Sequence, residues 1–134
     1  MHKLLSAALL AGLSFTACAQ EAPVRAEGLI NSPITTAPNH DLLMTRVRIA
    51  PNTILPMHSH PTEEFLYILG GQATLRIVGR NDQLLNAGAA VVIPAGAVHT
   101  AITHTGEAIA LTTRVHPKGQ PVRIAAPTPK PKKD

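Results

Sequence analysis

Turn-forming residues recur at short intervals between residues 42 and 116, and this spacing constrains the fold more than any other feature. Between the turns, Leu42–Ala50 and Gln72–Val78 alternate apolar and polar side chains, as half-buried strands do. The other expected strands are Thr53–His60, Glu64–Leu69, Gln83–Asn86, Ala89–Ile93, His99–His104 and Ala108–His116. None of these segments has a helical period. Roughly eight or nine short strands of this kind predict an all-β barrel or double sheet.

Three histidines and a glutamate in this region have the spacing of a metal site. His58 and His60 alternate, so they project from one face of a strand. A Pro-Thr turn follows them and lets Glu64 return from the next strand, and His99 in a later block can complete the set. Imidazole and carboxylate ligands suit a divalent transition metal. We predict one such ion as the cofactor, with Fe, Mn, Ni, Zn and Cu as alternatives.

Both histidine blocks resemble the two motifs of the cupin superfamily, in its small single-domain type. The first motif runs Gly, five residues, His-x-His, three or four residues, Glu, six residues, Gly. The second runs Gly, five residues, Pro-x-Gly, two residues, His, three residues, Asn. The matching positions are His58, His60, Glu64 and Gly71, then Gly88, Pro94, Gly96 and His99. The resemblance implies a cupin-type double-stranded β-helix, or jelly-roll barrel, whose ligands are these three histidines and Glu64.

Two positions depart from the motifs: Asn52 replaces the opening Gly of the first, and Thr103 replaces the closing Asn of the second. Asn is the non-glycine residue that best tolerates a left-handed backbone, and Thr can also hydrogen-bond a turn. We therefore expect the fold to survive both changes. The motif spacing also favours Glu64 over its neighbour Glu63, which we expect to face water.

Each candidate ligand also has a simpler explanation. A lone His-x-His is more often an exposed polar strand, and a lone histidine such as His99 is more often half-buried and satisfied. The joint spacing of both motifs favours the metal site. Further candidates have no assigned role. Tyr67 could present a hydroxyl or pack in the core, and Arg46, Arg48 and Arg76 could bind a carboxylate or be solvated. Near the entrance, the candidates are Met57, His104 and His116.

Residues 1–19 have the features of a secretory signal peptide. A positive start precedes the apolar run Leu4–Ala17, which is too short to span a bilayer. Cleavage before Gln20 fits this segment, and a lipoprotein signal that ends before Cys18 is the alternative. We expect an exported protein, periplasmic or secreted, with an outer-membrane lipoprotein as the alternative. Cys18 is the only cysteine, so no disulfide is expected.

The net charge of +4 is concentrated at the C-terminus. Six arginines and seven acids give residues 20–116 a charge of −1, whereas residues 117–134 carry +4. A basic tail without aromatic residues to stack on bases argues against a nucleic-acid partner. The predicted organisation is the signal (1–19), an N-terminal arm of linker and turns with an edge strand at Leu29-Ile30 (20–41), the barrel (42–116) and a disordered tail rich in Pro and Lys (117–134).

The resemblance implies a metal-dependent enzyme of dioxygenase, isomerase, decarboxylase or lyase type that acts on a small oxygen-bearing metabolite. The alternative is a non-catalytic cupin that binds or senses a metal or small ligand. We also expect a homodimer, because small cupins pair through strands at their barrel edges. A seed-storage-like structural barrel is disfavoured, because such proteins usually lack the full ligand set.

Overall fold

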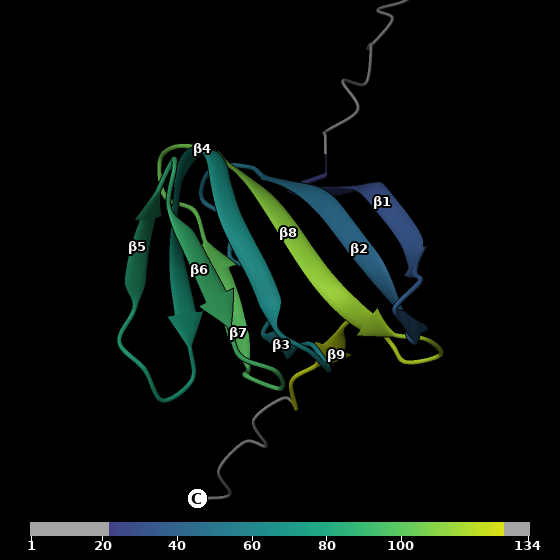
Figure 1. Ribbon diagram of the computed structural model, residues 1–134. Coiled ribbons are helices and arrows are strands. Elements are labelled where there is room, and N and C mark those ends of the chain that lie inside the picture. The colour runs from purple at the N-terminus through teal and green to yellow at the C-terminus, as the bar shows by residue number, and fades with distance from the viewer. Residues whose placement is uncertain (1–21, 128–134) are drawn as a thin grey trace, which may run out of the picture.

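The computed structural model describes residues 22–127, which form nine strands whose pairings are all antiparallel (Figure 1). The strands are β1 (Val24–Ile34), β2 (Ala37–Ile49), β3 (His58–Ser59), β4 (Glu64–Ile77), β5 (Gln83–Asn86), β6 (Ala90–Ile93), β7 (His99–Ile102), β8 (Ala108–Pro117) and β9 (Ile124–Ala125). The all-β prediction is confirmed. The predicted signal, with Cys18, lies outside the described residues, as do residues 128–134.

The described part of the chain contains no helix that could cross a bilayer.

Strand β4 joins two sheets, because it pairs with four other strands. Its first half pairs with β8 and β6, and its second half pairs with β5 and β7. On the far side of β8 lie β2 and β1, and beyond β7 lie β3 and β9. Figure 1 shows the strands curling around a common interior, with β3 and β9 at its lower end. The prediction of a double-sheet barrel is confirmed.

The glycine pair Gly70-Gly71 lies inside β4, although the sequence predicted that it would separate two strands. Glycine usually weakens a strand or marks a bend, so a break was the expected outcome. In the structure the register against β8 shifts between Ile68 and Gly70, and Gly71 has a φ of 70°. These residues form a β-bulge at which the strand passes from one sheet to the other.

This bulge decides which β4 side chains face the interior. Before it, Glu64 and Ile68 are 5% and 2% exposed, whereas after it Leu75 and Ile77 are the buried residues. Side chains alternate across a strand, so one inserted residue moves the inward set from even to odd positions. The same strand can therefore place a carboxylate inside one end of the barrel and an apolar row further along.

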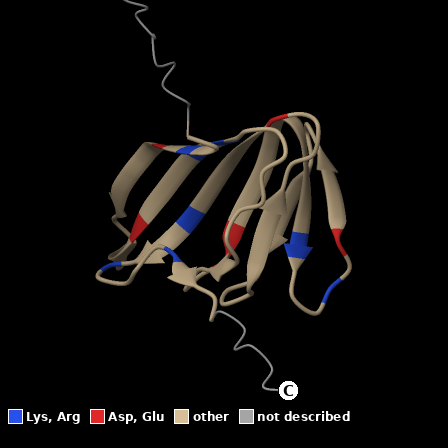
Figure 2. Ribbon diagram, turned by 180° about the vertical axis from the view of Figure 1, so that it is seen from behind, with Lys and Arg blue, Asp and Glu red and all other residues tan. Residues whose placement is uncertain are grey.

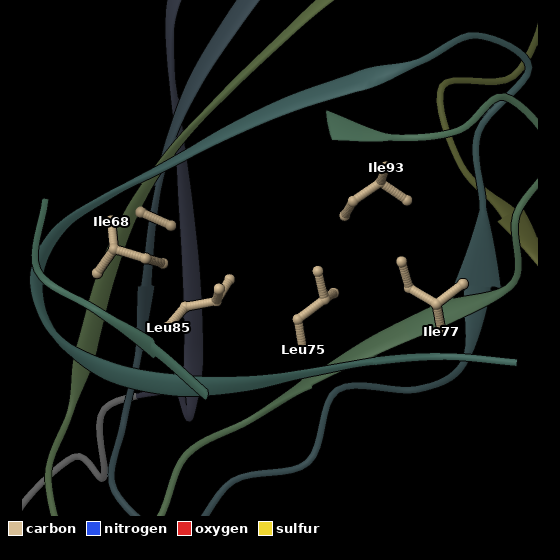
Figure 3. Close-up of a cluster of buried hydrophobic side chains, with 6 residues drawn as sticks. Ile68, Leu75, Ile77, Leu85 and Ile93 are labelled. Atoms are coloured by element: carbon tan, nitrogen blue, oxygen red, sulfur yellow. The ribbon is translucent and has the colours of Figure 1, made fainter. Parts of the chain in front are cut away.

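The core of the barrel is aliphatic. Figure 3 shows Ile68, Leu75, Ile77, Leu85 and Ile93, from β4, β5 and β6, directed toward a shared interior. Each is at most 6% exposed. Burial of each such side chain contributes about 1.5–3 kcal/mol relative to an exposed one. This packed cluster fills the barrel interior and supports the strands that carry the buried polar residues.

Over residues 20–41, the predicted edge strand at Leu29-Ile30 is part of β1, whereas the linker and turns predicted around it were wrong. Strand β1 pairs with β2 over most of its length, and β2 begins at Ala37 instead of Leu42. Gly28 and Pro33 had indicated turns, yet each lies at a register shift of β1. Glycine and proline are tolerated at such irregularities of an edge strand. Most β1 side chains are exposed, so no buried face generates the alternation that would have revealed the strand.

The C-terminal segment also departs from the prediction of a disordered tail from residue 117. Pro117 ends β8, and Ile124 and Ala125 form β9, which pairs with β3. The backbone N–H of Ala126 donates to the Met57 carbonyl over 3.1 Å. Residues 120–126, here named the C-terminal strap, therefore pack beside the strand that carries His58.

Both departures from the cupin motifs are accommodated as expected. Asn52 has a φ of 53°, the left-handed conformation that the motif glycine would supply. The Thr103 hydroxyl donates to the Ala50 carbonyl over 2.5 Å and accepts the Thr53 N–H over 3.0 Å. Thr103, 2% exposed, thus ties the end of the second motif to the turn that opens the first.

Replacement of this threonine by valine should destabilise the protein measurably. Thr103→Val keeps the shape but leaves the Ala50 carbonyl and the Thr53 amide without their side-chain partner. A lost partner of this kind costs about 1–3 kcal/mol of unfolding free energy. Urea denaturation measures the loss, and Thr113→Val, on the outer side of β8, is the matched control. Equal stability of the two variants would contradict the role given to Thr103.

Candidate metal centre

Three histidines meet at the end of the barrel where β3 and β7 pair. His58 on β3 lies opposite His99 on β7, and His60 follows β3 directly. One ring nitrogen from each of the three lies within 4.8 Å of the others. The rings are 8%, 4% and 4% exposed. Three buried imidazoles that converge this closely form a candidate site for a metal ion.

Each imidazole is oriented by a backbone carbonyl. The Nδ1 of His58 contacts the Pro56 carbonyl at 2.9 Å, and the Nδ1 of His99 contacts the Ala97 carbonyl at 2.8 Å. The Nδ1 of His60 contacts the Val122 carbonyl of the C-terminal strap. A ring that donates Nδ1–H to a carbonyl presents its Nε2 lone pair to a metal. For His58 and His99 the backbone therefore favours the tautomer that metal binding requires. The His60 Nε2 lies 2.8 Å from the Glu64 Oε2, so it would have to give up its hydrogen bond to that carboxylate to bind a metal.

Glu64 lies beside the same nitrogens. Its Oε2 is 2.8 Å from the His60 Nε2 and 3.9 Å from the His99 Nε2. The structure thus brings together all four residues that the sequence singled out, and Glu63 is exposed as expected. Their assignment as ligands remains a prediction, which the geometry allows.

Protonation states in the site suit a cation. Burial is the main cause that lowers the pKa of His58 to about 4, and burial also lowers the pKa of His99. Burial would raise the pKa of Glu64, but the hydrogen bond with His60 and the charge of Arg114 outweigh it and lower that pKa to about 2. Near neutral pH, His58 and His99 are neutral and Glu64 is ionised. Metal binding requires these states of the ligands, and the donor set fits a divalent transition ion.

Arg114 is the site residue that the sequence analysis missed. Its Nη2 donates to the Glu64 Oε2 over 2.6 Å and lies 3.2 Å from the His60 Nε2. Its side chain is buried. A signal was available: alternation along β8 puts Arg114 on the same face as the buried Ala108, Ala110 and Thr112. The arginine was overlooked because this residue type is usually solvated.

The three arginines considered in its place lie on the surface. Arg46 pairs with Glu27, Arg48 pairs with Glu107 and Arg76 pairs with Asp82, each at 2.6–2.7 Å. All three are about half exposed, so each pair contributes little to stability. Figure 2 shows the blue and red positions spread over several strands and loops of the described ribbon.

The other candidates lie outside the ligand cluster. Tyr67 is 43% exposed on the outer face of β4, and His104 is exposed, with its Nε2 3.0 Å from the Thr74 hydroxyl. His116 is 5% exposed and its Nε2 contacts the Gln120 carbonyl at 2.9 Å. Met57 is half-buried.

A cavity of about 90 Å³ occupies the barrel interior next to the cluster. Its polar lining residues are His58, Glu64, His99, Thr112 and Arg114, and every other lining residue is Ala, Val, Leu or Ile. The wall of the cavity is therefore aliphatic apart from these five residues. The arrangement places one polar, charged end against an apolar chamber, as small-ligand sites usually do.

The C-terminal strap completes the surroundings of two histidines. Besides the contact of the Val122 carbonyl with His60, Arg123 donates from Nη2 to the Pro56 carbonyl over 2.8 Å. The same Nη2 lies 3.2 Å from the His58 Nδ1. Partners that orient metal-binding histidines are usually worth about 10- to 100-fold in metal affinity.

Truncation tests this role of the strap. A chain that ends at Gly119 should bind zinc about 10- to 100-fold more weakly than the full chain, because His60 loses the acceptor that orients it. A chain that ends at Pro127 keeps the strap and removes only the basic end, so it is the control. Competition titration with a chromophoric chelator gives both affinities, and circular dichroism verifies that both chains fold. Equal affinities would contradict the assignment.

Comparison with solved structures shows the same fold in proteins of low identity. A DMSP lyase, DddQ from Ruegeria pomeroyi DSS-3, superposes with a TM-score of 0.64 at 23% identity, over 77% of this chain and 51% of the lyase. A cupin-like protein from Thermotoga maritima MSB8 gives 0.64 at 18% identity, over 77% and 75% of the two chains. The polyketide cyclase RemF from Streptomyces resistomycificus gives 0.61 at 23% identity, over 79% and 72%.

The chain spans about half the length of the DMSP lyase, and at these identities the likeness establishes the fold alone. No curated protein matches the sequence significantly. The family model described as "Cupin domain" matches residues 45–114, which include all four candidate ligands and Arg114. The match covers more than half of the 134 residues, and the chain therefore belongs to the cupin superfamily.

Proposed function

We propose that this cupin is a metal-dependent enzyme that acts on a small oxygen-bearing metabolite. His58, His60, Glu64 and His99 would hold one divalent transition metal ion. The observation that carries the proposal is the convergence of three carbonyl-oriented imidazoles and one ionised carboxylate at the polar end of an aliphatic cavity. When bound, the metal supplies a Lewis-acidic centre with positions left for an oxygen ligand.

The chain's own residues would bind and shield the substrate. The aliphatic wall excludes water from the cavity, which strengthens the interactions of Arg114 and Glu64 inside it. Arg114 neutralises Glu64 and holds its Oε2 beside the histidines. The reaction would be of dioxygenase, isomerase, decarboxylase or lyase type. The fold is shared with proteins described as a DMSP lyase and a polyketide cyclase, so it is compatible with more than one of these classes and selects none of them.

The second candidate function is a non-catalytic cupin that binds or senses a metal or a small ligand. One observation favours it: apart from the candidate ligands, Arg114 is the only titratable residue that lines the cavity in the described part of the chain. The arginine guanidinium stays protonated and cannot accept a proton, so the cavity lining offers no separate general base.

A substrate screen distinguishes the two candidates. The metal-reconstituted protein is incubated with small hydroxy acids, keto acids, enols and catechols, and NMR follows each compound. An enzyme consumes at least one of them, and His99→Ala abolishes that consumption. A binding protein shows saturable binding without turnover, in which case the catalytic proposal is wrong.

We also propose export, periplasmic or secreted, with a lipid-anchored form as the alternative; the features of residues 1–19 support it. Fractionation of the native host tests this, and recovery of uncleaved protein in the cytoplasm would contradict it.

A homodimer is proposed as well. The outer side of β4 and β6 exposes Phe65, Tyr67, Leu69 and Val92, each 43–54% exposed, and an apolar surface of this kind supports self-association. Light scattering should give twice the chain mass, whereas a monomer mass would contradict the dimer.

A further inference from the structure

Among residues 22–127, four buried side-chain polar atoms have no hydrogen-bond partner, and two of the four belong to residues that line the central cavity. These two are the Nε of Arg114 and the hydroxyl oxygen of Thr112. The two residues are 7% and 5% exposed, and both line the central cavity. Buried polar groups in folded proteins are nearly always satisfied, so each exception calls for an explanation. Here two of the four exceptions lie in one cavity.

Strand geometry explains why they occur together. Residues 112 and 114 are two positions apart on β8, so both side chains project from its inner face. Their backbones are separated by about 6.6 Å along the strand. The two atoms are therefore placed to meet two different oxygen groups of one short ligand.

The chemistry of the two atoms restricts that ligand. An arginine Nε–H is a donor only, so it requires an acceptor, and a carboxylate oxygen is the strongest acceptor for it. The threonine hydroxyl can serve a hydroxyl or a keto oxygen. Arg114 already uses Nη2 to hold Glu64, which leaves its Nε for another partner.

The remaining wall restricts the ligand further. Every lining residue other than the candidate ligands, Thr112 and Arg114 is aliphatic, and the cavity measures only about 90 Å³. A long or aromatic ligand would exceed this volume, and a multiply charged ligand would leave charged groups against the aliphatic wall. A short aliphatic chain would not.

We propose that Thr112 and Arg114 form a binding subsite for a small aliphatic hydroxy- or keto-carboxylate. The carboxylate lies on Arg114 and the second oxygen faces Thr112. This inference rests on the proposed function, because it names the substrate class of the same site.

Calorimetric titration of the zinc-loaded protein tests the subsite, with lactate and propanoate as probes. The two acids differ in one hydroxyl. Lactate should bind about 5- to 10-fold more tightly than propanoate, the difference that one hydrogen bond gives. Thr112→Val should lower the affinity for lactate to that for propanoate and leave propanoate unchanged. Thr113→Val, on the outer side of the same strand, should change neither.

Arg114→Lys is the second variant. It keeps a positive charge near Glu64 but removes the Nε donor, so both acids should bind about 10-fold more weakly. Equal responses to Thr112→Val and Thr113→Val, or equal affinities of lactate and propanoate for the unaltered protein, would overturn the subsite.

Zinc content separates this inference from the proposed function. Elemental analysis of the same samples gives the zinc bound per chain. If zinc is bound but lactate discrimination is absent, the subsite is wrong and the metal site stands. If neither zinc nor any of Fe, Mn, Ni and Cu is bound, the proposed function fails, and titration of the metal-free protein with the same variants decides the subsite alone.

Discussion

Gly71→Ala is expected to lower the free energy of unfolding by more than about 3 kcal/mol. A Cβ at this position would lie 1.9 Å from the backbone oxygen of Glu107 and 2.9 Å from its carbonyl carbon. Backbone atoms cannot rotate away as a side chain can, so the β4–β8 pairing of Gly71 with Ala108 must be displaced. The left-handed φ of 70° adds about 1–2 kcal/mol for any residue with a Cβ. Urea denaturation of the metal-free protein measures the loss.

Gly79→Ala is the matched control. Gly79 has a φ of 79°, but a Cβ there would meet nothing within 4 Å. Only the cost of the left-handed φ remains for alanine, so the expected loss of unfolding free energy is about 1–2 kcal/mol. If both alanine variants lose the same free energy, the close approach of Glu107 to β4 does not contribute, and the explanation of the bulge is wrong.

Arg114→Met is expected to destabilise the metal-free protein by about 3–5 kcal/mol. The substitution removes the cation that lies 2.6 Å from Glu64, a residue 5% exposed, and leaves a buried carboxylate without its main counter-charge. Breaking one partner of a buried ion pair typically costs this much. Thermal and urea unfolding of the apoprotein report the change.

A double variant verifies the cause of that loss. Glu64→Gln removes the charge that Arg114→Met leaves unpaired, so the two changes together should destabilise less than the sum of the single changes. The coupling expected for residues in direct contact is about 0.5–3 kcal/mol. Strictly additive losses would show that Arg114 acts through packing and not through Glu64.

The parts of the fold that bury a face could be predicted from the sequence. The region 42–116 alternates strongly because one side of most of its strands packs on the aliphatic core, and most of its strands appear where expected. The strand predicted over Thr53–His60 was wrong in extent, because only His58 and Ser59 form β3 and Ile54 makes an isolated bridge. Asn52 and Thr103 were also predicted correctly, because a left-handed φ and a turn hydrogen bond are local properties of a residue type.

The errors have a different physical origin. Strand β1 is an edge strand with mostly exposed side chains, so its sequence shows no alternation. Gly28 and Pro33 therefore indicated turns, although β1 pairs with β2 through both positions. The same holds for β4, where Gly70-Gly71 marks a bend between sheets and not an end. Local sequence does not distinguish a bulge from a turn when the partner strands are unknown.

The sequence predicted the candidate ligands of the site but not the groups that hold them in place. The two motifs pointed to the three histidines and Glu64, which lie together in the structure. Arg114 could have been found through the alternation of β8, but the sequence analysis did not consider it. The Val122 carbonyl that orients His60 has no sequence signature, because any residue supplies a carbonyl and only the path of the strap places it there.

The metal content of the purified protein tests the central claim most directly. Elemental analysis of the full chain, grown with transition metals present and dialysed, should give about one divalent transition ion per chain. His60→Ala and His99→Ala should each retain a small fraction of it. His104→Ala, which changes an exposed histidine outside the cluster, should retain all of it. Equal metal in the unaltered protein and in His60→Ala would contradict the account.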